Sequence, residues 1–184
     1  MHTINTVTVP IDDIIKYDNK KYNSNNHWNN NIRPINYDHV LSLTHTETWI
    51  DKFKPDTIKI NITNPKHINF LKLAYECCSI TGKFSHIYDD ELEELVKDLD
   101  DEYPDVFTEQ FFVRVNNVSL KYGEHGVGPY TDFKKIIMSM VSSIKGHSPI
   151  NSETNNVTIY LCPWCNIDDE FRVFVYKNSI TAIS

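Results

Sequence analysis

The spacing of hydrophobic side chains changes along the chain and predicts a mixture of strands and helices. In five segments apolar and polar residues alternate, or β-branched and aromatic residues predominate, as is typical of half-buried strands. The last two segments flank a turn-compatible Lys-Asn-Ser sequence, which predicts a β-hairpin. The predicted strands are residues 57–62, 110–115, 157–162, 170–176 and 180–184.

Helical spacing follows the first predicted strand. Asn64 and Pro65 are typical of an N-cap and a first helical turn, and Gly82 is typical of the position after a helix. This pattern makes Cys77 a core residue. The apolar stripe of this helix is predicted to be Phe70, Leu73, Cys77 and Ile80.

Three further segments have helical spacing. Residues 89–102 place leucine and valine among many carboxylates, so we expect a solvated acidic face rather than a metal site. Thr131 is predicted to cap a helix that ends at Gly146. Residues 49–53 predict a short helix or packed loop. The predicted fold class is therefore α+β, with a β-rich end after the last helix.

Composition and charge narrow the classes of partner. The chain has 184 residues, 40% of them hydrophobic and 23% charged, and a formal net charge of −7, which gives no support for an extended nucleic-acid surface. No apolar run approaches the roughly 20 residues that span a bilayer, and no signal peptide is recognisable, so we expect no membrane partner and a cytoplasmic location. Residues 1–36, which are rich in Asn from residue 18, are expected to form a loose segment without assigned function.

Cysteine and histidine patterns give little support to metal or hydrolytic chemistry. Cys162 and Cys165 have CxxC spacing, but no second pair supplies the other two ligands of a structural zinc site. A redox pair is expected at the start of a helix, whereas a predicted strand follows this motif. Ordinary reduced thiols are therefore expected. The chain has neither an HExxH motif nor a Ser-centred nucleophile elbow.

Glycines and cations raise the question of phosphate binding. Residues 123–128 contain a GxxGxG sequence, whose spacing matches neither the Walker A nor the Rossmann fingerprint. Arg114, Lys121 and Arg172 lie on two predicted strands and one loop, and they can converge on a polyphosphate. Taken singly, each fits a surface charge or a cross-strand ion pair as well. Sequence spacing leaves both interpretations open.

The segment around two of these cations resembles the cell division cycle protein 123 family, whose fold is ATP-grasp-like. Residues 112–121 (FVRVNNVSLK) are followed by Trp164, by residues 170–175 (EFRVFV) and by residues 180–184 (ITAIS), in the order of the family's motifs. Trp49, Phe53, Thr57 and Lys59 resemble its N-terminal segment. Arg114 stands where the family usually has its first lysine, and Asn117 stands where it usually has tryptophan.

The resemblance implies a partial ATP-grasp-like domain over residues 37–184, incomplete at its C-terminal end. Arg114 and Lys121 would face the phosphates, residues 160–164 would form the hinge beside adenine, and Arg172 would approach the phosphate tail. No catalytic or metal-binding residue is implied within the chain. The cofactor-binding residues that the resemblance implies are Arg114, Lys121, Leu161, Cys162, Trp164 and Arg172.

The family acts as an ATP-binding assembly chaperone for translation initiation factor 2 and contacts its gamma subunit, with a role in the cell cycle. The implied cofactor is ATP, joined by Mg²⁺ only if carboxylates beyond Ser184 are supplied, because the family's Asp and Asn metal ligands follow that strand. ATP binding is thus expected rather than ATP-dependent catalysis. The alternatives are an ATP-grasp ligase or kinase-like enzyme, and a fragment that binds protein without nucleotide.

Overall fold

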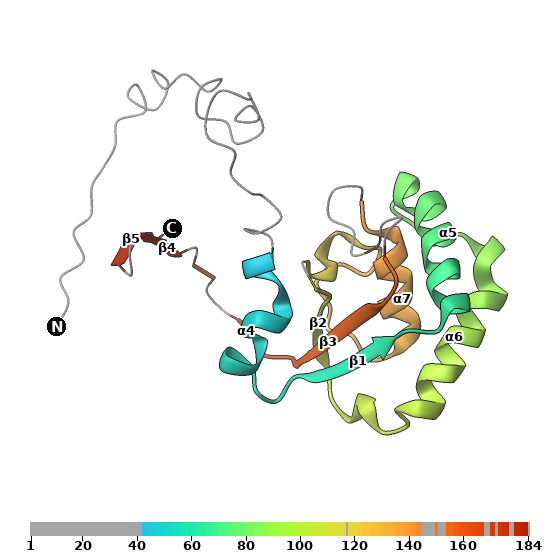
Figure 1. Cartoon of the computed structure of the whole chain (residues 1–184), viewed down its shortest axis with the longest axis horizontal. Coiled ribbons are helices and arrows are strands. Elements are labelled where there is room, and N and C mark those ends of the chain that lie inside the picture. The colour runs from blue at the N-terminus through green and yellow to red at the C-terminus, as the bar shows by residue number, and fades with distance from the viewer. Residues whose placement is uncertain are drawn as a thin grey trace, which may run out of the picture. The chain divides into compact units, whose positions relative to one another are not determined.

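The computed structural model describes residues 42–116, 118–144, 150, 154–167, 170–171, 173–176 and 179–183, all within the compact unit Leu41–Ser184. The predicted N-terminal segment, residues 1–36, lies outside the described residues. The fold is α+β, as predicted (Figure 1). The α-helices are α4 (Thr46–Phe53), α5 (Pro65–Thr81), α6 (Asp89–Glu102) and α7 (Phe133–Ser142). The strands are β1 (Ile58–Ile62), β2 (Phe111–Arg114), β3 (Val157–Pro163), β4 (Val173–Tyr176) and β5 (Ser179–Ile183). Three short 3₁₀-helices are η2 (His86–Tyr88), η3 (Val106–Thr108) and η4 (Leu120–Tyr122).

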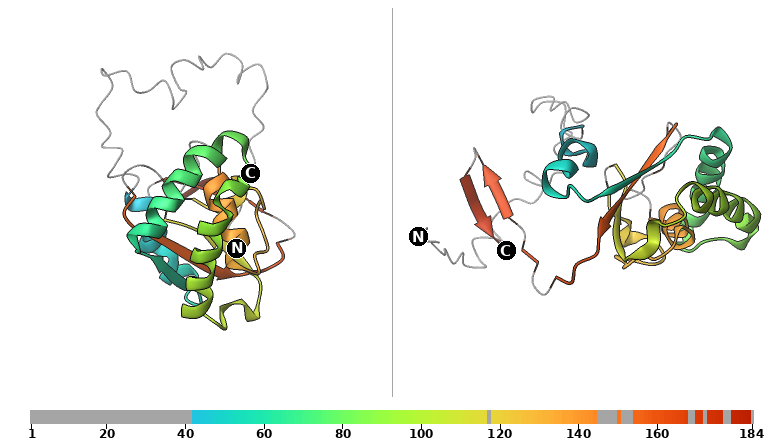
Figure 2. Two further views of the ribbon diagram at one scale, coloured as in Figure 1. Left: turned by 90° about the vertical axis from the view of Figure 1, so that its right-hand side faces the viewer. Right: turned by 90° about the horizontal axis from the view of Figure 1, so that it is seen from below.

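A three-stranded antiparallel sheet organises the main body, in the order β1-β3-β2. The central strand β3 pairs Leu161 with Ile58 on one side and with Val113 on the other. Helices α5, α6 and α7 lie on one side of this sheet and α4 on the other (Figures 1 and 2). Because side chains alternate along a strand, each strand presents one set to the three-helix layer and the other to α4.

The main hydrophobic core lies between the sheet and the three-helix layer. Phe111 and Val113 of β2 point into it, as the alternation of residues 110–115 predicted. The acidic helix α6 contributes its leucines, with Val96 packed at the border of the core, and its carboxylates remain on the outer face, which confirms the predicted solvated face. The core residues that α6 and α7 contribute include Leu92, Leu95, Leu99, Phe133, Ile136, Ile137, Met140 and Val141.

Helix α5 begins and ends as predicted, but a different stripe is buried. Asn64 Oδ1 accepts a hydrogen bond from the Lys66 amide, and Gly82 adopts a left-handed conformation with φ of 69°. Leu73 and Ile80, predicted to be core residues, are 52% and 83% exposed. Cys78 is fully buried in place of Cys77, which is only half-buried. The buried stripe runs through His67, Leu71, Ala74 and Cys78.

The prediction of the α5 stripe was right for Phe70, which is buried, and wrong for Leu73 and Ile80, because hydrophobicity alone does not identify the buried face. The buried stripe includes a histidine and a small alanine, whereas leucine and isoleucine occupy the exposed positions. The cap of α7 also differs by one residue, because Asp132 rather than Thr131 accepts the hydrogen bond from the Lys135 amide, at 2.8 Å. The predicted helix end at Gly146 lies outside the described residues.

Strands β4 and β5 form the predicted hairpin, a separate two-stranded antiparallel sheet. Val173 pairs with Ile183 and Tyr176 pairs with Ser179, with a register shift between Phe174 and Val175. None of the helices in the described part of the chain has the length and apolar content needed to cross a bilayer.

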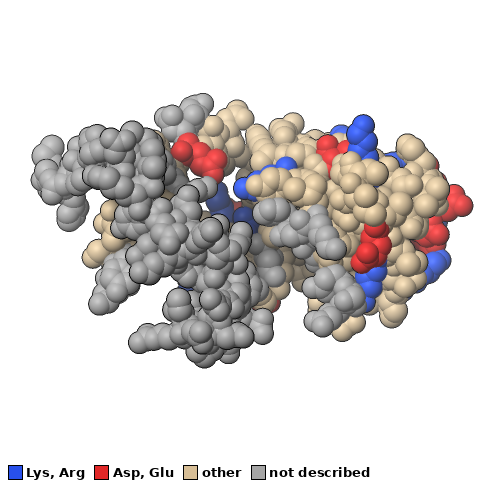
Figure 3. Space-filling view, turned by 90° about the horizontal axis from the view of Figure 1, so that it is seen from above, with Lys and Arg blue, Asp and Glu red and all other residues tan. Residues whose placement is uncertain are grey.

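Surface charge is mixed on the face seen in Figure 3. Acidic and basic side chains are interspersed over the area of the three-helix layer, and the described part of this view shows no extended basic area. Part of this mixture comes from direct pairing, since the Lys66 ammonium contacts the Glu94 carboxylate. On the face seen in this view, a mixed surface of this kind has no extended positive potential that would attract a polyanion.

Candidate functional site

The side of the sheet that carries α4 brings together Arg114 and Cys162, two of the six predicted cofactor-binding residues. We call it the α4 face. Ile50 of α4 is fully buried there against Tyr160 and Cys162 of β3, with Trp49 and Phe112 at the border of this small cluster. The sheet residues of the α4 face are Lys59, Asn61, Phe112, Arg114, Thr158, Tyr160 and Cys162.

Arg114 lies at the end of β2, paired in register with Tyr160 of the central strand. Its guanidinium carbon lies 5.2 Å from the centroid of the Trp49 ring, which is a cation–π contact. Its Nε atom is buried and has no hydrogen-bond partner. Burial lowers the pKa of Arg114, an effect that Cys162 partly opposes. Among the described residues no carboxylate forms an ion pair with this guanidinium, so its charge remains available to an external anion.

Helix α4 is attached to the sheet by polar contacts as well as by Ile50. The Thr46 hydroxyl contacts the carbonyl oxygens of Val115 and Asn116, at 2.9 and 2.7 Å. The Thr46 amide also donates to the Asn116 carbonyl at 2.7 Å. Asn116 Nδ2 lies 3.3 Å from His45 Nδ1, while Asn116 Oδ1 is buried without a partner. These contacts hold the start of α4 against the end of β2, beside Arg114.

Lys121 lies on η4, close in the chain to the residue that pairs with Arg114. After β2 the backbone turns, with the Val115 amide donating to the Val118 carbonyl at 2.8 Å, and Ser119 pairs with Arg114 as an isolated bridge. Lys121 follows two residues later, is exposed, and places its Nζ 5.1 Å from the centroid of the Tyr122 ring. The fold therefore brings the two predicted cations to the same end of β2.

The three predicted adenine-hinge residues do not share one environment. Leu161 is fully buried in the core on the three-helix side, so its side chain is separated from the α4 face by the sheet. Cys162 is buried on the α4 face, where its sulfur accepts a hydrogen bond from the Thr57 hydroxyl at 3.6 Å. Trp164 follows β3 and is half-buried, and its backbone amide donates to the Gln110 carbonyl at 2.8 Å. Of this predicted set, Cys162 is buried on the α4 face, while the Trp164 indole N–H donates to Asn166 Oδ1 at 3.2 Å just beyond the end of β3.

Two residues of the predicted site region lie outside the described residues. These are Arg172, predicted to approach the phosphate tail, and Asn117, which stands at the position of the family's tryptophan. Cys162 and Cys165 are both free thiols, as are Cys77 and Cys78, in agreement with the expectation of reduced cysteines.

The glycine-rich loop between β2 and α7 uses its backbone amides internally. The Glu124 amide donates to the Ser142 hydroxyl at 2.9 Å, and the His125 amide donates to the Ser139 hydroxyl at 3.1 Å. Gly123 packs so closely on α7 that a Cβ atom there would overlap the Ser139 backbone carbonyl. Phosphate binding would need free amides of this kind. Gly123 therefore serves close packing on α7, beside the buried Ser139 and Ser142 of that helix.

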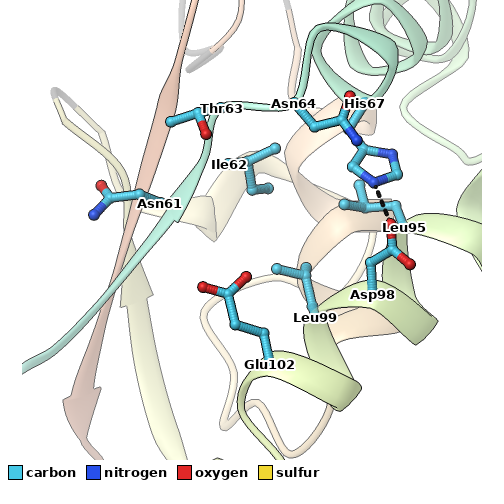
Figure 4. Close-up of a pocket in the computed structure, with 9 residues that line it drawn as sticks. All are labelled: Asn61, Ile62, Thr63, Asn64, His67, Leu95, Asp98, Leu99 and Glu102. Carbon is cyan, nitrogen blue, oxygen red and sulfur yellow. Dashed lines mark hydrogen bonds and ion pairs between the residues drawn. The ribbon is translucent and has the colours of Figure 1, made fainter.

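A small cavity of about 150 Å³ lies on the other side of the sheet, between the end of β1, the start of α5 and the end of α6 (Figure 4). Its main polar feature is the buried His67 imidazole, whose Nε2 lies 2.8 Å from Asp98 Oδ2. The cavity lining contains no Ser, Cys or Lys nucleophile. None of the predicted site residues lines it. We therefore place the candidate site on the α4 face, where an unpaired cation supplies a reason to bind a ligand.

Metal ligands were also sought among the described residues. They contain no group of three or more His, Cys, Asp or Glu side chains arranged to hold a metal ion. On the α4 face, the Asp51 carboxylate is engaged by the Lys59 ammonium at 2.7 Å. Because Mg²⁺ in nucleotide sites uses only one or two carboxylates besides phosphate oxygens, no ligand for it is assigned among the described residues.

Comparisons with known proteins give no relative from which a role can be transferred. No protein-family model, no curated protein and no solved structure matches the chain. The interpretation of the α4 face thus depends on its own geometry and on the motif resemblance given above.

Proposed function

We propose that the α4 face binds the phosphates of a nucleoside triphosphate, with ATP as the nucleotide. The single observation that carries this proposal is the state of Arg114: a half-buried guanidinium at the end of a strand, with no carboxylate partner among the described residues. Burying a charge without a counter-charge is unfavourable. An anionic ligand that accepts hydrogen bonds from the guanidinium offsets this cost, and phosphate oxygens are suited to do so.

The surroundings of Arg114 support a phosphate tail rather than an isolated carboxylate. Lys121 adds a second positive charge at the same end of β2. Trp164 lies four residues along β3 from Tyr160, the register partner of Arg114, a separation of about 13 Å at about 3.3 Å per residue. An extended nucleoside triphosphate has a comparable length, and an indole ring offers a surface for a base.

The wider role that we propose follows the motif resemblance. The chain would be a partial ATP-grasp-like protein of the cell division cycle protein 123 type. It would act in the cytoplasm as an ATP-binding assembly chaperone for translation initiation factor 2 and contact its gamma subunit. Support comes from the order of the motifs, from the α+β fold and from the α4 face, which carries Arg114, with Lys121 two residues after its bridge partner Ser119. No metal ligand is assigned among the described residues, and the proposal includes no metal-dependent step.

The first experiment measures thermal unfolding during titration with ATP, with and without Mg²⁺. A ligand that binds only the folded protein adds about 2.7 kcal/mol at a hundredfold excess over its Kd, which corresponds to about 5–11 °C in Tm for a chain of this size. Arg114→Met and Lys121→Met are expected to reduce this shift. Adenosine, which lacks phosphates, is the matched ligand control and should shift the Tm much less. Absence of any ATP shift in the unmodified protein would refute nucleotide binding.

The second experiment tests the partner by pull-down of the purified gamma subunit of translation initiation factor 2, with and without ATP. Binding that strengthens with ATP is the expected result. Binding without any ATP effect, together with an unchanged Tm, would favour the alternative of a protein-binding fragment. Release of ADP in the presence of an acceptor would favour the ligase or kinase-like alternative. No binding at all would contradict the chaperone role.

A further inference from the structure

The Trp49 ring has a fixed position against Arg114. Its indole N–H donates to the Thr44 carbonyl at 3.3 Å, and its ring packs on Phe53 with the centroids 6.4 Å apart. The ring is therefore held by its hydrogen bond to Thr44 and its contact with Phe53, in addition to its contact with the guanidinium. Its helix is held on the sheet by Thr46 at one end and by Ile50 at its centre.

This arrangement divides the donors of Arg114 into two groups. Nε is buried and has no partner, and it is the only guanidinium nitrogen of Arg114 with both properties. An oxyanion arriving from solvent consequently meets the two Nη groups before it can reach Nε. A guanidinium offers either its Nη pair, end-on, or one Nη with Nε, side-on, for a bidentate contact. With α4 in place, only the end-on pair is accessible.

We infer that Trp49 is a positioning residue, which stacks on the face of the Arg114 guanidinium and, with Nε buried, holds the Nη pair end-on toward an oxyanion. The ring attracts the cation without neutralising it, in contrast to a carboxylate, which would compete with the ligand. Its contribution to affinity is orientation, because a guanidinium already held in the binding geometry loses less freedom when the ligand arrives. For ATP as the ligand, this inference rests on the proposed function, whereas the orientation itself is a property of the free protein.

The orientation is tested first without ligand, by NMR of the Arg114 Nε–Hε group in labelled protein. In the unmodified chain this proton is expected to exchange slowly with solvent and to be shifted upfield by the Trp49 ring. Trp49→Phe should retain both signatures, and Trp49→Leu should remove the upfield shift and accelerate exchange. Phe53→Leu removes an aromatic ring from the same helix that contacts Trp49 but not Arg114, and it is the matched control. Unchanged signatures in Trp49→Leu would overturn the inference.

The consequence for binding is tested with ATP and with inorganic tripolyphosphate. Loss of the ring is expected to weaken both by about 3–30-fold, and Trp49→Phe should remain within about threefold of the unmodified protein. Equal affinity in Trp49→Leu and the unmodified protein would overturn the positioning role. If neither ligand binds the unmodified protein, the proposed function fails, while the NMR signature still decides the orientation.

A second measurement covers the case in which Trp49→Leu does not fold. Replacement of all tryptophans by 5-fluorotryptophan keeps the ring shape but weakens the attraction of its face for a cation. The inference expects weaker tripolyphosphate binding and a changed Nε–Hε shift, with circular dichroism unaltered. Unchanged affinity and an unchanged shift would contradict it.

Discussion

Replacement of Arg114 by methionine should leave the stability of the protein nearly unchanged or raise it, while ligand binding is lost. The change removes a charge whose surroundings are unfavourable to it. Burial lowers the pKa of the guanidinium, with Cys162 partly opposing this effect, and the buried Nε has no partner. Methionine has an unbranched, flexible side chain of similar reach and can pack against Trp49 and Ile50.

The expected magnitude follows from two opposing contributions. A buried donor without a partner costs about 1–3 kcal/mol, and this cost disappears with the guanidinium. The cation–π contact with Trp49, which disappears as well, contributes about 0.5–2 kcal/mol. The free energy of unfolding is therefore expected to change by between a loss of about 1 and a gain of about 2.5 kcal/mol, with a small gain at the middle of this range. For a chain of this length each kcal/mol corresponds to about 2–4 °C in Tm.

The assay is urea unfolding followed by circular dichroism, with ATP titration of the same samples. Lys121→Met is the matched control, since it removes an exposed cation and should change the free energy of unfolding by no more than about 0.5 kcal/mol. A loss of more than about 1 kcal/mol in Arg114→Met would refute the reasoning. It would mean that the guanidinium stabilises the fold through contacts within the protein, and that it is not left unpaired for a ligand.

Two further changes test packing and electrostatics. Gly123→Ala should lower the free energy of unfolding by about 1–3 kcal/mol, because the new Cβ would overlap the Ser139 carbonyl. Gly82→Ala, where space is open and only the left-handed backbone opposes the change, should cost about 1–2 kcal/mol. An effect of Gly123→Ala within about 0.5 kcal/mol of zero in urea unfolding would contradict the packing. Asp132→Asn keeps the cap of α7 but has no titratable group. Burial alone would raise the pKa of Asp132. Hydrogen bonds from the Lys135 amide and ammonium, together with the charge of that ammonium, outweigh burial and lower the pKa below 3.8. The contribution of the Asp132 carboxylate to stability is present above pH 3.8 and is lost as the pH falls through its lower pKa in the folded state. The difference in free energy of unfolding between the unmodified protein and Asp132→Asn should therefore shrink between about pH 5 and pH 2. A difference that does not depend on pH would refute this account.

Part of the candidate site follows from local sequence. Alternation along residues 110–115 predicts that Arg114 and Phe112 share one face of β2, and the structure agrees. The same alternation along β3 predicts that Tyr160 and Cys162 share a face opposite to Leu161. What the sequence could not supply is the ring that covers Arg114, because Trp49 and Arg114 lie 65 positions apart in the sequence. Helical spacing around Trp49 predicted a short helix but no partner for it.

The sequence by itself determined the elements whose signals are local: the strands with alternating side chains, the acidic face of α6, the cap of α5 and the hairpin. These depend on periodicity and on the conformational preferences of single residues, which neighbours in the chain are sufficient to express. Only the tertiary structure decided which stripe of α5 is buried, that the Glu124 and His125 amides of the loop bond to α7, and that Trp49 of α4 lies over Arg114. Each of these depends on contacts between distant segments, such as Thr46 with Asn116, 70 positions away, where packing and hydrogen bonding outweigh local hydrophobicity.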